Sequence, residues 1–269
     1  MLPADQRPLT LRMIFDQVVD DYDAVRPGYP SALIDDIITI STLPANGSVL
    51  EIGCGTGQAT IPFAQRGYQI TCVELGPTLA ARAIAKCQSY PNVMIHVTSF
   101  EDWPAQPEAF DLVMSATAFH WIPPEIGYPK AARILKPTGA LTIFSNEHPT
   151  PYTDFFAEVQ PIYQRVVPEW SHIQTSPSIE TRIAATVATI NETGLFAPVI
   201  VKTYPWSQTY STHEYLRLLN TYSDHRNLAP QQRTQLFQEI GDVLERKYGG
   251  TITKPYLTVL YLAKKESVQ

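Results

Sequence analysis

The sequence predicts an α/β protein whose doubly wound, mostly parallel sheet has seven strands, with N-terminal helices and a mostly helical inserted cap. Three observations predict this class. Short apolar runs rich in Val, Ile and Leu alternate with helical stretches through the first half of the chain. A glycine-rich loop follows the first of these runs, where doubly wound sheets bind their ligands. The second half is mostly helical but holds two further strand-like runs.

Seven runs are predicted to form strands because each is short, apolar or alternating, and bounded by turn residues. The strand–helix–strand spacing of the first five indicates parallel pairing. The last two could extend the same sheet, so one sheet with an inserted cap is favoured over two independent domains. The runs are Ser48–Ile52, Gln69–Val73, Val93–Val97, Phe110–Met114, Ala140–Phe144, Val199–Thr203 and Tyr256–Leu262.

Helices are predicted before, between and after these strands. Pro77 suits the start of a helix, because the N–H that proline lacks has no partner there. The expected helices are Leu9–Val19, Ser31–Ser41, Gly57–Arg66, Pro77–Cys87, Pro124–Leu135, Tyr152–Val167, Ile179–Thr193, Thr212–Leu219 and Ala229–Tyr248. The expected organisation is a leader (1–42), a sheet domain (43–146 and about 196–269) and cap elements (147–195 and about 208–248).

The charge balance argues against a nucleic-acid partner. The 269 residues carry a formal net charge of −6, and only 17% are charged. Affinity for nucleic acid comes largely from clustered Lys and Arg, whereas the basic clusters here, Arg246-Lys247 and Lys264-Lys265, are short. We therefore expect a small-molecule substrate.

Membrane and metal association are not expected either. No run approaches the ~20 apolar residues of a membrane helix, and the N-terminus has no signal-peptide pattern. The three cysteines lack CxxC spacing, so no metal site is predicted and a reduced, cytoplasmic setting is expected. They are Cys54, Cys72 and Cys87.

The loop after the first strand holds the strongest functional signal. Gly53, Gly55 and Gly57 alternate with single residues, which lets the backbone bend sharply and approach a ligand. Glu74 ends the next strand about 20 residues later, where a carboxylate can accept hydrogen bonds from a ribose. The ligand predicted is a nucleoside. A nicotinamide dinucleotide is the less favoured alternative, because its GxGxxG fingerprint needs a glycine where Gln58 stands.

The segments VLEIGCGTGQAT and CVELG resemble the first two motifs of class I S-adenosylmethionine (SAM)-dependent methyltransferases. Ser99–Asp102, Ala118–Trp121 and Leu135–Gly139 resemble later segments of that family in the same order, although a second glycine is commoner where Thr138 stands. The leader, with Arg26-Pro-Gly-Tyr-Pro, resembles the small-molecule branch called type 11, which includes trans-aconitate methyltransferases. The resemblance covers residues 15 to about 145.

This resemblance implies SAM as the cofactor and assigns roles to individual positions. Gly53, Gly55 and Gly57 would pass under the methionine portion of SAM. Glu51 would support the loop or meet the amino group, and Glu74 would bind the ribose. The remaining cofactor contacts would come from Leu75, Phe100, Glu101 and Ala116.

The reaction implied is in-line methyl transfer to an oxygen, nitrogen or carbon of a small acceptor, and a carboxylate is one candidate. Such an acceptor needs no base, whereas a hydroxyl or amine does. His120 is the candidate base because histidine titrates near neutrality, although it could simply be packed. Arg26 could bind an anionic acceptor, and Tyr22 could close over the cofactor. Glu74 could instead cap the following helix, His148 is a further pocket candidate, and a non-catalytic SAM sensor stays open.

Overall fold

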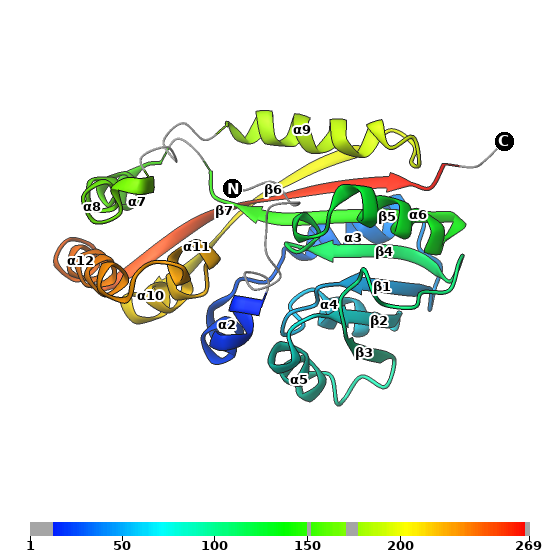
Figure 1. The fold of residues 1–269 in the computed structure, drawn as a ribbon, viewed down its shortest axis with the longest axis horizontal. Coiled ribbons are helices and arrows are strands. Elements are labelled where there is room, and N and C mark those ends of the chain that lie inside the picture. The colour runs from blue at the N-terminus through cyan, green and yellow to red at the C-terminus, as the bar shows by residue number, and fades with distance from the viewer. Residues whose placement is uncertain (1–12, 150–151, 171–176, 267–269) are drawn as a thin grey trace.

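A computed structural model describes residues 13–149, 152–170 and 177–266, and it contains one seven-stranded sheet with helices on both faces (Figure 1). The strand order is β3-β2-β1-β4-β5-β7-β6. The pairs among β1 to β5 are parallel, while β7 runs antiparallel to both β5 and β6. The predicted fold class is therefore confirmed.

All seven predicted strands form, and the last three exceed their predicted lengths most. Residues 136–139, which precede the predicted fifth strand, lie inside β5 and form a bulge, because the β4–β5 pairing jumps from Phe110–Leu135 to Leu112–Ala140. The strands are β1 (Ser48–Ile52), β2 (Gln69–Glu74), β3 (Val93–Val97), β4 (Phe110–Ala116), β5 (Leu135–Glu147), β6 (Ile200–Ser211) and β7 (Thr251–Lys264).

The helices of the first half differ from prediction in two places. The helix predicted over 9–19 lies partly outside the described residues, and its described part is a 3-10 helix that continues as α2 to Val25. The helix predicted from Gly57 begins only at Thr60, because Gly57 has a φ of +93°. The elements are η2 (Met13–Val18), α2 (Val19–Val25), α3 (Ser31–Ser41), α4 (Thr60–Ala64), α5 (Pro77–Lys86), η3 (Phe119–Trp121) and α6 (Pro124–Ile134).

Both faces of the sheet are covered, which explains the continuous apolar runs in its central strands. On one face α3, α4 and α5 bury residues such as Leu33 and Phe63, each 0% exposed. On the other face α6 buries Ile134, and α9 (Ile179–Glu192) buries Ile190. In Figure 1, α9 accordingly lies along the sheet and not with the cap helices at its end.

The cap grows from the sheet itself. Residues 257–264 of β7 pair with β5, but residues 251–256 pair only with β6, so β6 and β7 continue beyond the sheet as a two-stranded ribbon. The helices around this ribbon share a separate apolar core that includes Phe155 and Leu236. They are α7 (Asp154–Glu158), α8 (Gln160–Val166), α10 (Thr212–Asn220), α11 (Ser223–Arg226) and α12 (Pro230–Tyr248).

Local signals define the limits of the cap helices. Ser211 and Glu214 form a capping box that starts α10 directly at the end of β6. Gly249, with a φ of +64°, ends α12 and turns the chain into β7. None of the helices in the described ranges is long and apolar enough to span a membrane.

Candidate functional site

The glycine loop bends over the carboxyl ends of the central strands. Gly53 has a φ of +72°, and a Cβ atom there would lie 2.5 Å from the Cβ of Ala118. Gly55 has a φ of +56°, and a Cβ there would lie 3.3 Å from the Tyr22 ring. Any side chain at Gly53 would therefore collide with the chain that leaves β4, and Tyr22 lies directly over Gly55.

Glu74 ties this loop to the next turn. Its Oε2 accepts a hydrogen bond from the Gly55 N–H and its Oε1 accepts one from the Gly76 N–H, both at 2.9 Å. Burial raises the pKa of Glu74. The N–H groups in the first turn of α5 bond to another carboxylate, since Thr78 and Leu79 both donate to Asp16 at 2.7 and 2.8 Å. Asp16 of the leader, and not Glu74, thus serves that first turn.

Glu51 carries an unsatisfied oxygen at the base of the site. The side chain is 0% exposed, and its Oε2 accepts a hydrogen bond from Thr60 Oγ1 at 2.6 Å. Its Oε1 is buried and has no hydrogen-bond partner among the described residues. Burial raises the pKa of Glu51 to about 7. A buried acceptor without a donor is costly, so this oxygen is suited to a ligand that supplies one.

A cavity of about 550 Å³, counting the solvent at its mouth, joins the three parts of the chain. The sheet domain contributes the glycine loop, Glu51 and Ala116 to its wall. Tyr22 and Arg26 of the leader and Tyr222 of the cap complete it, together with Tyr256 of β7. Residues that are far apart in the sequence therefore enclose one small space.

Arg26 brings a cation to the same cavity wall as Glu51. Its Nη2 donates to the carbonyl of Thr221 at 2.5 Å, and its guanidinium lies 4.9 Å from the Tyr22 ring centroid and 4.8 Å from that of Tyr222. Its Nε is buried without a hydrogen-bond partner in the described part of the chain. One spare donor and one spare acceptor thus face the same cavity.

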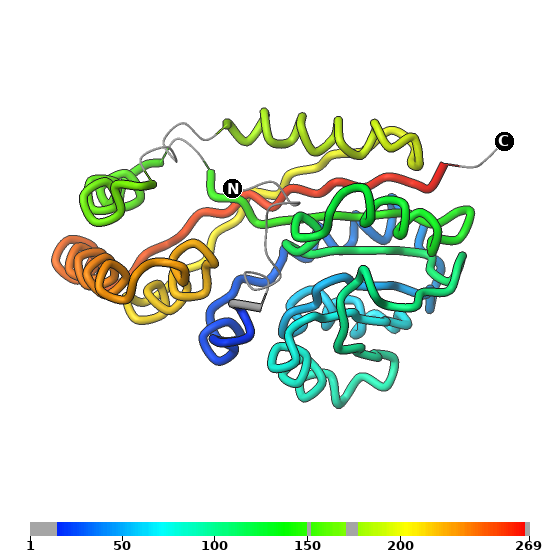
Figure 2. Tube along the Cα trace, in the orientation of Figure 1, coloured from blue at the N-terminus to red at the C-terminus, as the bar shows by residue number. Residues whose placement is uncertain are grey.

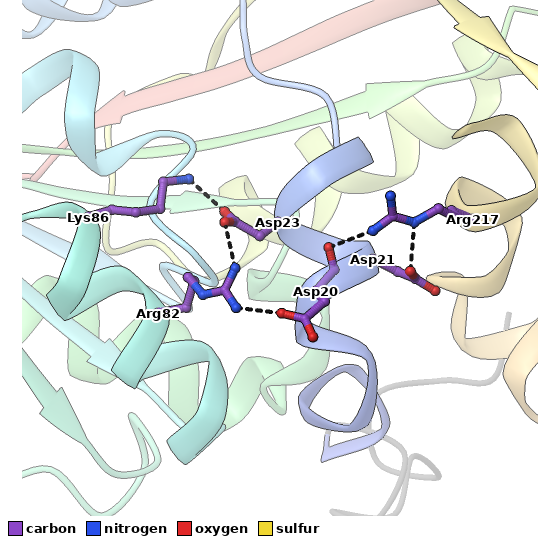
Figure 3. A network of polar contacts seen from close by, with 6 residues as sticks. All are labelled: Asp20, Asp21, Asp23, Arg82, Lys86 and Arg217. Atoms are coloured by element: carbon purple, nitrogen blue, oxygen red, sulfur yellow. Dashed lines mark hydrogen bonds and ion pairs between the residues drawn. The ribbon is translucent and has the colours of Figure 1, made fainter. Parts of the chain in front are cut away.

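Ion pairs hold the leader in place on both sides (Figure 3). The acidic α2 lies between α5 of the sheet domain and α10 of the cap, as the blue segment of Figure 2 also shows. Basic residues of both helices pair with its acids. The leader is therefore a wall that connects the two larger parts across the cavity. The pairs are Asp20–Arg82 (2.5 Å), Asp23–Arg82 (3.0 Å), Asp23–Lys86 (2.6 Å) and Asp21–Arg217 (2.7 Å).

Several predicted site residues lie away from this cavity wall. Phe100 is 2% exposed and belongs to the apolar core, so its ring is not presented to the cavity. Glu101 and Leu75 are half-buried in the loops that follow β3 and β2. His120 is half-buried on η3, with its ring 5.2 Å from that of Trp121, and is not among the lining residues. The role of His120 as a base stays a hypothesis.

The sequence analysis missed other wall residues. Asn146 lines the cavity and donates to the Gly28 carbonyl at 3.0 Å, while its Oδ1 accepts from Thr258 at 2.5 Å. Asn146 lies just past the predicted end of the fifth strand. The same position makes His148 a pocket candidate in the sequence. Tyr256 begins a predicted strand and does not follow one, so no such signal marks it.

The residues present fit SAM. Its methionine end carries both an ammonium and a carboxylate, and the cavity offers the unpaired Glu51 oxygen and the unpaired Arg26 Nε. Gly53 and Cys54 of the glycine loop line the cavity, so a ligand there would lie against the backbone of the loop. Within the described ranges no group of three or more His, Cys, Asp or Glu side chains could hold a metal ion.

Comparisons with known proteins agree with this fit. Residues 49–139 match the model of the methyltransferase domain family. An uncharacterized methyltransferase-like protein of Schizosaccharomyces pombe is 25% identical over 235 residues, which cover 85% of each chain. An uncharacterized methyltransferase of Mycobacterium tuberculosis is 31% identical over 137 residues, covering 51% of this chain and 53% of that protein.

A solved structure shares the fold. Phosphoethanolamine N-methyltransferase 2 of Haemonchus contortus, in complex with phosphomonomethylethanolamine and S-adenosylhomocysteine, superposes with a TM-score of 0.55 at 16% identity. The match covers 93% of this chain and 57% of that chain. These matches decide for SAM over the nicotinamide alternative. The chain is a SAM-dependent methyltransferase with the class I fold.

Proposed function

We propose that the chain methylates a small molecule in the cavity between the sheet domain, the leader and the cap, and that this acceptor carries a carboxylate or another anion. The observation that supports it best is the enclosed wall, in which Tyr22, Tyr222 and Tyr256 leave space for a metabolite but not for a folded partner. The net charge of −6 also disfavours nucleic acid as the acceptor.

In this proposal Glu51 and Arg26 hold the two charged groups at the methionine end of the cofactor. Glu51 Oε1 accepts from the ammonium, and Arg26 Nε donates to the carboxylate. Both atoms are buried and otherwise unpartnered within the described residues, so pairing removes two desolvation penalties at once. This role for Arg26 differs from the acceptor-binding role expected from the sequence, because Arg26 shares its cavity with the glycine loop.

When bound, SAM supplies a methyl group on a sulfonium, which is already a good electrophile. The chain then has to align the acceptor and exclude water, and alignment alone can contribute roughly 7–11 kcal/mol. Burial raises the pKa of Tyr22, so its hydroxyl stays protonated and can donate a hydrogen bond but not remove a proton. The described lining residues include no histidine. A carboxylate acceptor, which needs no base, suits this wall.

We also propose a cytoplasmic location. All three cysteines are buried and free, which suits a compartment that keeps thiols reduced.

Isothermal titration with SAM and with S-adenosylhomocysteine tests the binding step. We expect both to bind, and absence of binding at high micromolar ligand would refute the proposal. Incubating the enzyme with a metabolite extract and methyl-labelled SAM, followed by mass spectrometry, tests transfer. Labelled anionic products are expected, whereas tight SAM binding without any labelled product would indicate a sensor. Arg246→Ala, an exposed change on α12, is the matched control.

A further inference from the structure

A buried lysine lies in the cap-side part of β7. Lys254 is 5% exposed, and its Nζ lies 4.5 Å from the ring centroid of Tyr256 and 5.4 Å from that of Phe156. No carboxylate or hydrogen-bond acceptor of the described residues pairs with it. Contacts with aromatic rings replace only part of the hydration free energy that an ammonium loses on burial. The Lys254 ammonium is therefore incompletely stabilised by these contacts.

A second unsatisfied nitrogen lies beside it. The His148 ring lies 4.5 Å from the Phe156 ring, which Lys254 also contacts. Its Nδ1 lies 2.9 Å from the carbonyl of Pro149, and its Nε2 is buried without a partner in the described part of the chain. Burial, and then the charge of Lys254, lower the pKa of His148 to about 4. Neutral His148 with Nδ1–H bonded to Pro149 therefore presents an Nε2 lone pair to a donor.

Two carboxylates on the neighbouring elements are already engaged elsewhere. Glu147, the last residue of β5 and the neighbour of His148 in the sequence, pairs with Arg182 of α9 at 3.0 Å. Glu158 of α7 pairs with Lys247 and accepts from Tyr248. The fold thus places acids within one or two residues of this cluster but directs them to other cations. Neither Glu147 nor Glu158 pairs with Lys254.

The cluster adjoins the cavity of the glycine loop. Lys254 lies two residues before Tyr256, and His148 lies two residues after Asn146, and both of these neighbours line the cavity. Side chains two residues apart in a strand share a face and are separated by about 7 Å. Within β7, Lys254 therefore lies about 7 Å along the strand from Tyr256, a residue of the cavity wall.

From this arrangement we propose that Lys254, with His148 beside it, forms the subsite that receives an anionic group of the methyl acceptor, a carboxylate or a phosphate. The apolar body of the acceptor lies against the rings of Phe156 and Tyr256. A hydroxyl or amine next to the anion donates to His148 Nε2. This inference rests on the proposed function, because it names the chemistry of the acceptor in that same site.

Aromatic anions of similar shape test the subsite. The enzyme loaded with S-adenosylhomocysteine is titrated with benzoate, with phenyl phosphate and with the neutral benzamide. At least one of the two anions should bind, and benzamide should bind at least tenfold more weakly than that anion. The stronger of the two anions identifies carboxylate or phosphate as the preferred group. In Lys254→Met the preferred anion should lose at least tenfold in affinity. Lys254→Gln, which keeps a polar group but no charge, should lose as much affinity for this anion. It replaces Lys254→Met in the test if the methionine variant folds poorly.

Lys202→Met is the matched control, since Lys202 is exposed on the adjacent strand β6 and pairs with Asp36. It should bind every probe as the wild type does. A lysine-selective ¹³C NMR titration gives a second readout: burial lowers the pKa of Lys254 to about 7, and the bound anion should raise it by more than one unit.

The subsite is refuted if benzamide binds as well as both anions, or if Lys254→Met keeps the wild-type affinity. Titration with SAM separates this outcome from failure of the proposed function. Unchanged SAM binding together with no anion preference overturns only the subsite, whereas loss of SAM binding in the wild type overturns the proposed function itself.

Discussion

The unsatisfied carboxylate of Glu51 makes a quantitative prediction for cofactor binding. Burial raises the pKa of Glu51 to about 7, so the ionised fraction in the free protein changes steeply around neutrality. If only the ionised form pairs with the ammonium of SAM, the apparent Kd scales inversely with that fraction. From pH 6 to pH 7.5 the fraction rises from about one tenth to about three quarters, and the Kd should fall about eightfold.

The assay is isothermal titration of SAM at steps between these two pH values and constant ionic strength. An α-amino group with a pKa of roughly 7.7–8.0 stays mostly protonated in this window, so the enzyme group dominates the slope. Buffers of different ionisation enthalpy should also show release of about half a proton on binding at pH 7. In Glu51→Gln the slope should vanish. Its affinity at pH 7.5 should be about 10- to 150-fold lower, because a hydrogen bond to a charged group contributes roughly 1.5–3 kcal/mol.

The same variant should be more stable than the wild type in the free state. The folded protein keeps the Glu51 proton that the unfolded chain gives up, so this group's contribution to stability falls as the pH rises from 4.5 to about 7 and is lowest above that range. Replacing the acid should recover at most about 3 kcal/mol at neutral pH. Glu192→Gln, an exposed change at the end of α9, should alter neither property. An unchanged pH slope in Glu51→Gln would refute the assignment of this carboxylate to the ammonium.

Three further outcomes are expected. Gly53→Ala should abolish SAM binding and should lower stability in thermal unfolding more than the control Gly194→Ala. Gly194 also has a positive φ, of +64°, but a Cβ there would meet no atom within 4 Å, so this variant should lose only the roughly 1–2 kcal/mol that a left-handed residue costs. Asp23→Asn should speed SAM release a few-fold in stopped-flow displacement, because partly exposed ion pairs contribute about 0.2–1 kcal/mol each. Salt should speed release in the wild type, because it screens these ion pairs. The wild type should become more stable to denaturant between about pH 7 and 10, because over this range the folded state has lost the Lys254 proton that the unfolded chain retains. In Lys254→Met this rise in stability should be absent.

The sheet was predictable where burial is two-sided. β1 and β4 are buried on both faces, so they appear as continuous apolar runs whose limits agree with the prediction to within two residues. The glycine loop was predictable for a related reason. A backbone that must adopt positive φ against Ala118 leaves glycine as the residue that fits, and this requirement is visible in the sequence.

The ribbon of β6 and β7 was harder to predict, because its sequence shows neither a continuous apolar run nor a regular alternation of apolar and polar residues. Pro205 and Pro255 interrupt the two strands, and prolines usually argue against a strand interior. Cross-strand contact overrides that signal, as in the stacked pair Trp206–Tyr256 at 5.0 Å, and extends both strands beyond their predicted ends. Lys254 lies in this extension, so its burial followed only from tertiary contacts.

The leader explains why cofactor and acceptor sites cannot be independent. α2 has only seven residues, and an isolated helix of that length is unstable in water, so its place depends on the ion pairs to α5 and to α10. Tyr22 of α2 covers Gly55, while Arg26 just after it rests against Tyr222 of the cap. A ligand that strengthens either contact therefore stabilises the wall that the other ligand uses. By thermodynamic linkage we expect the acceptor to tighten SAM binding by the same factor by which SAM tightens acceptor binding.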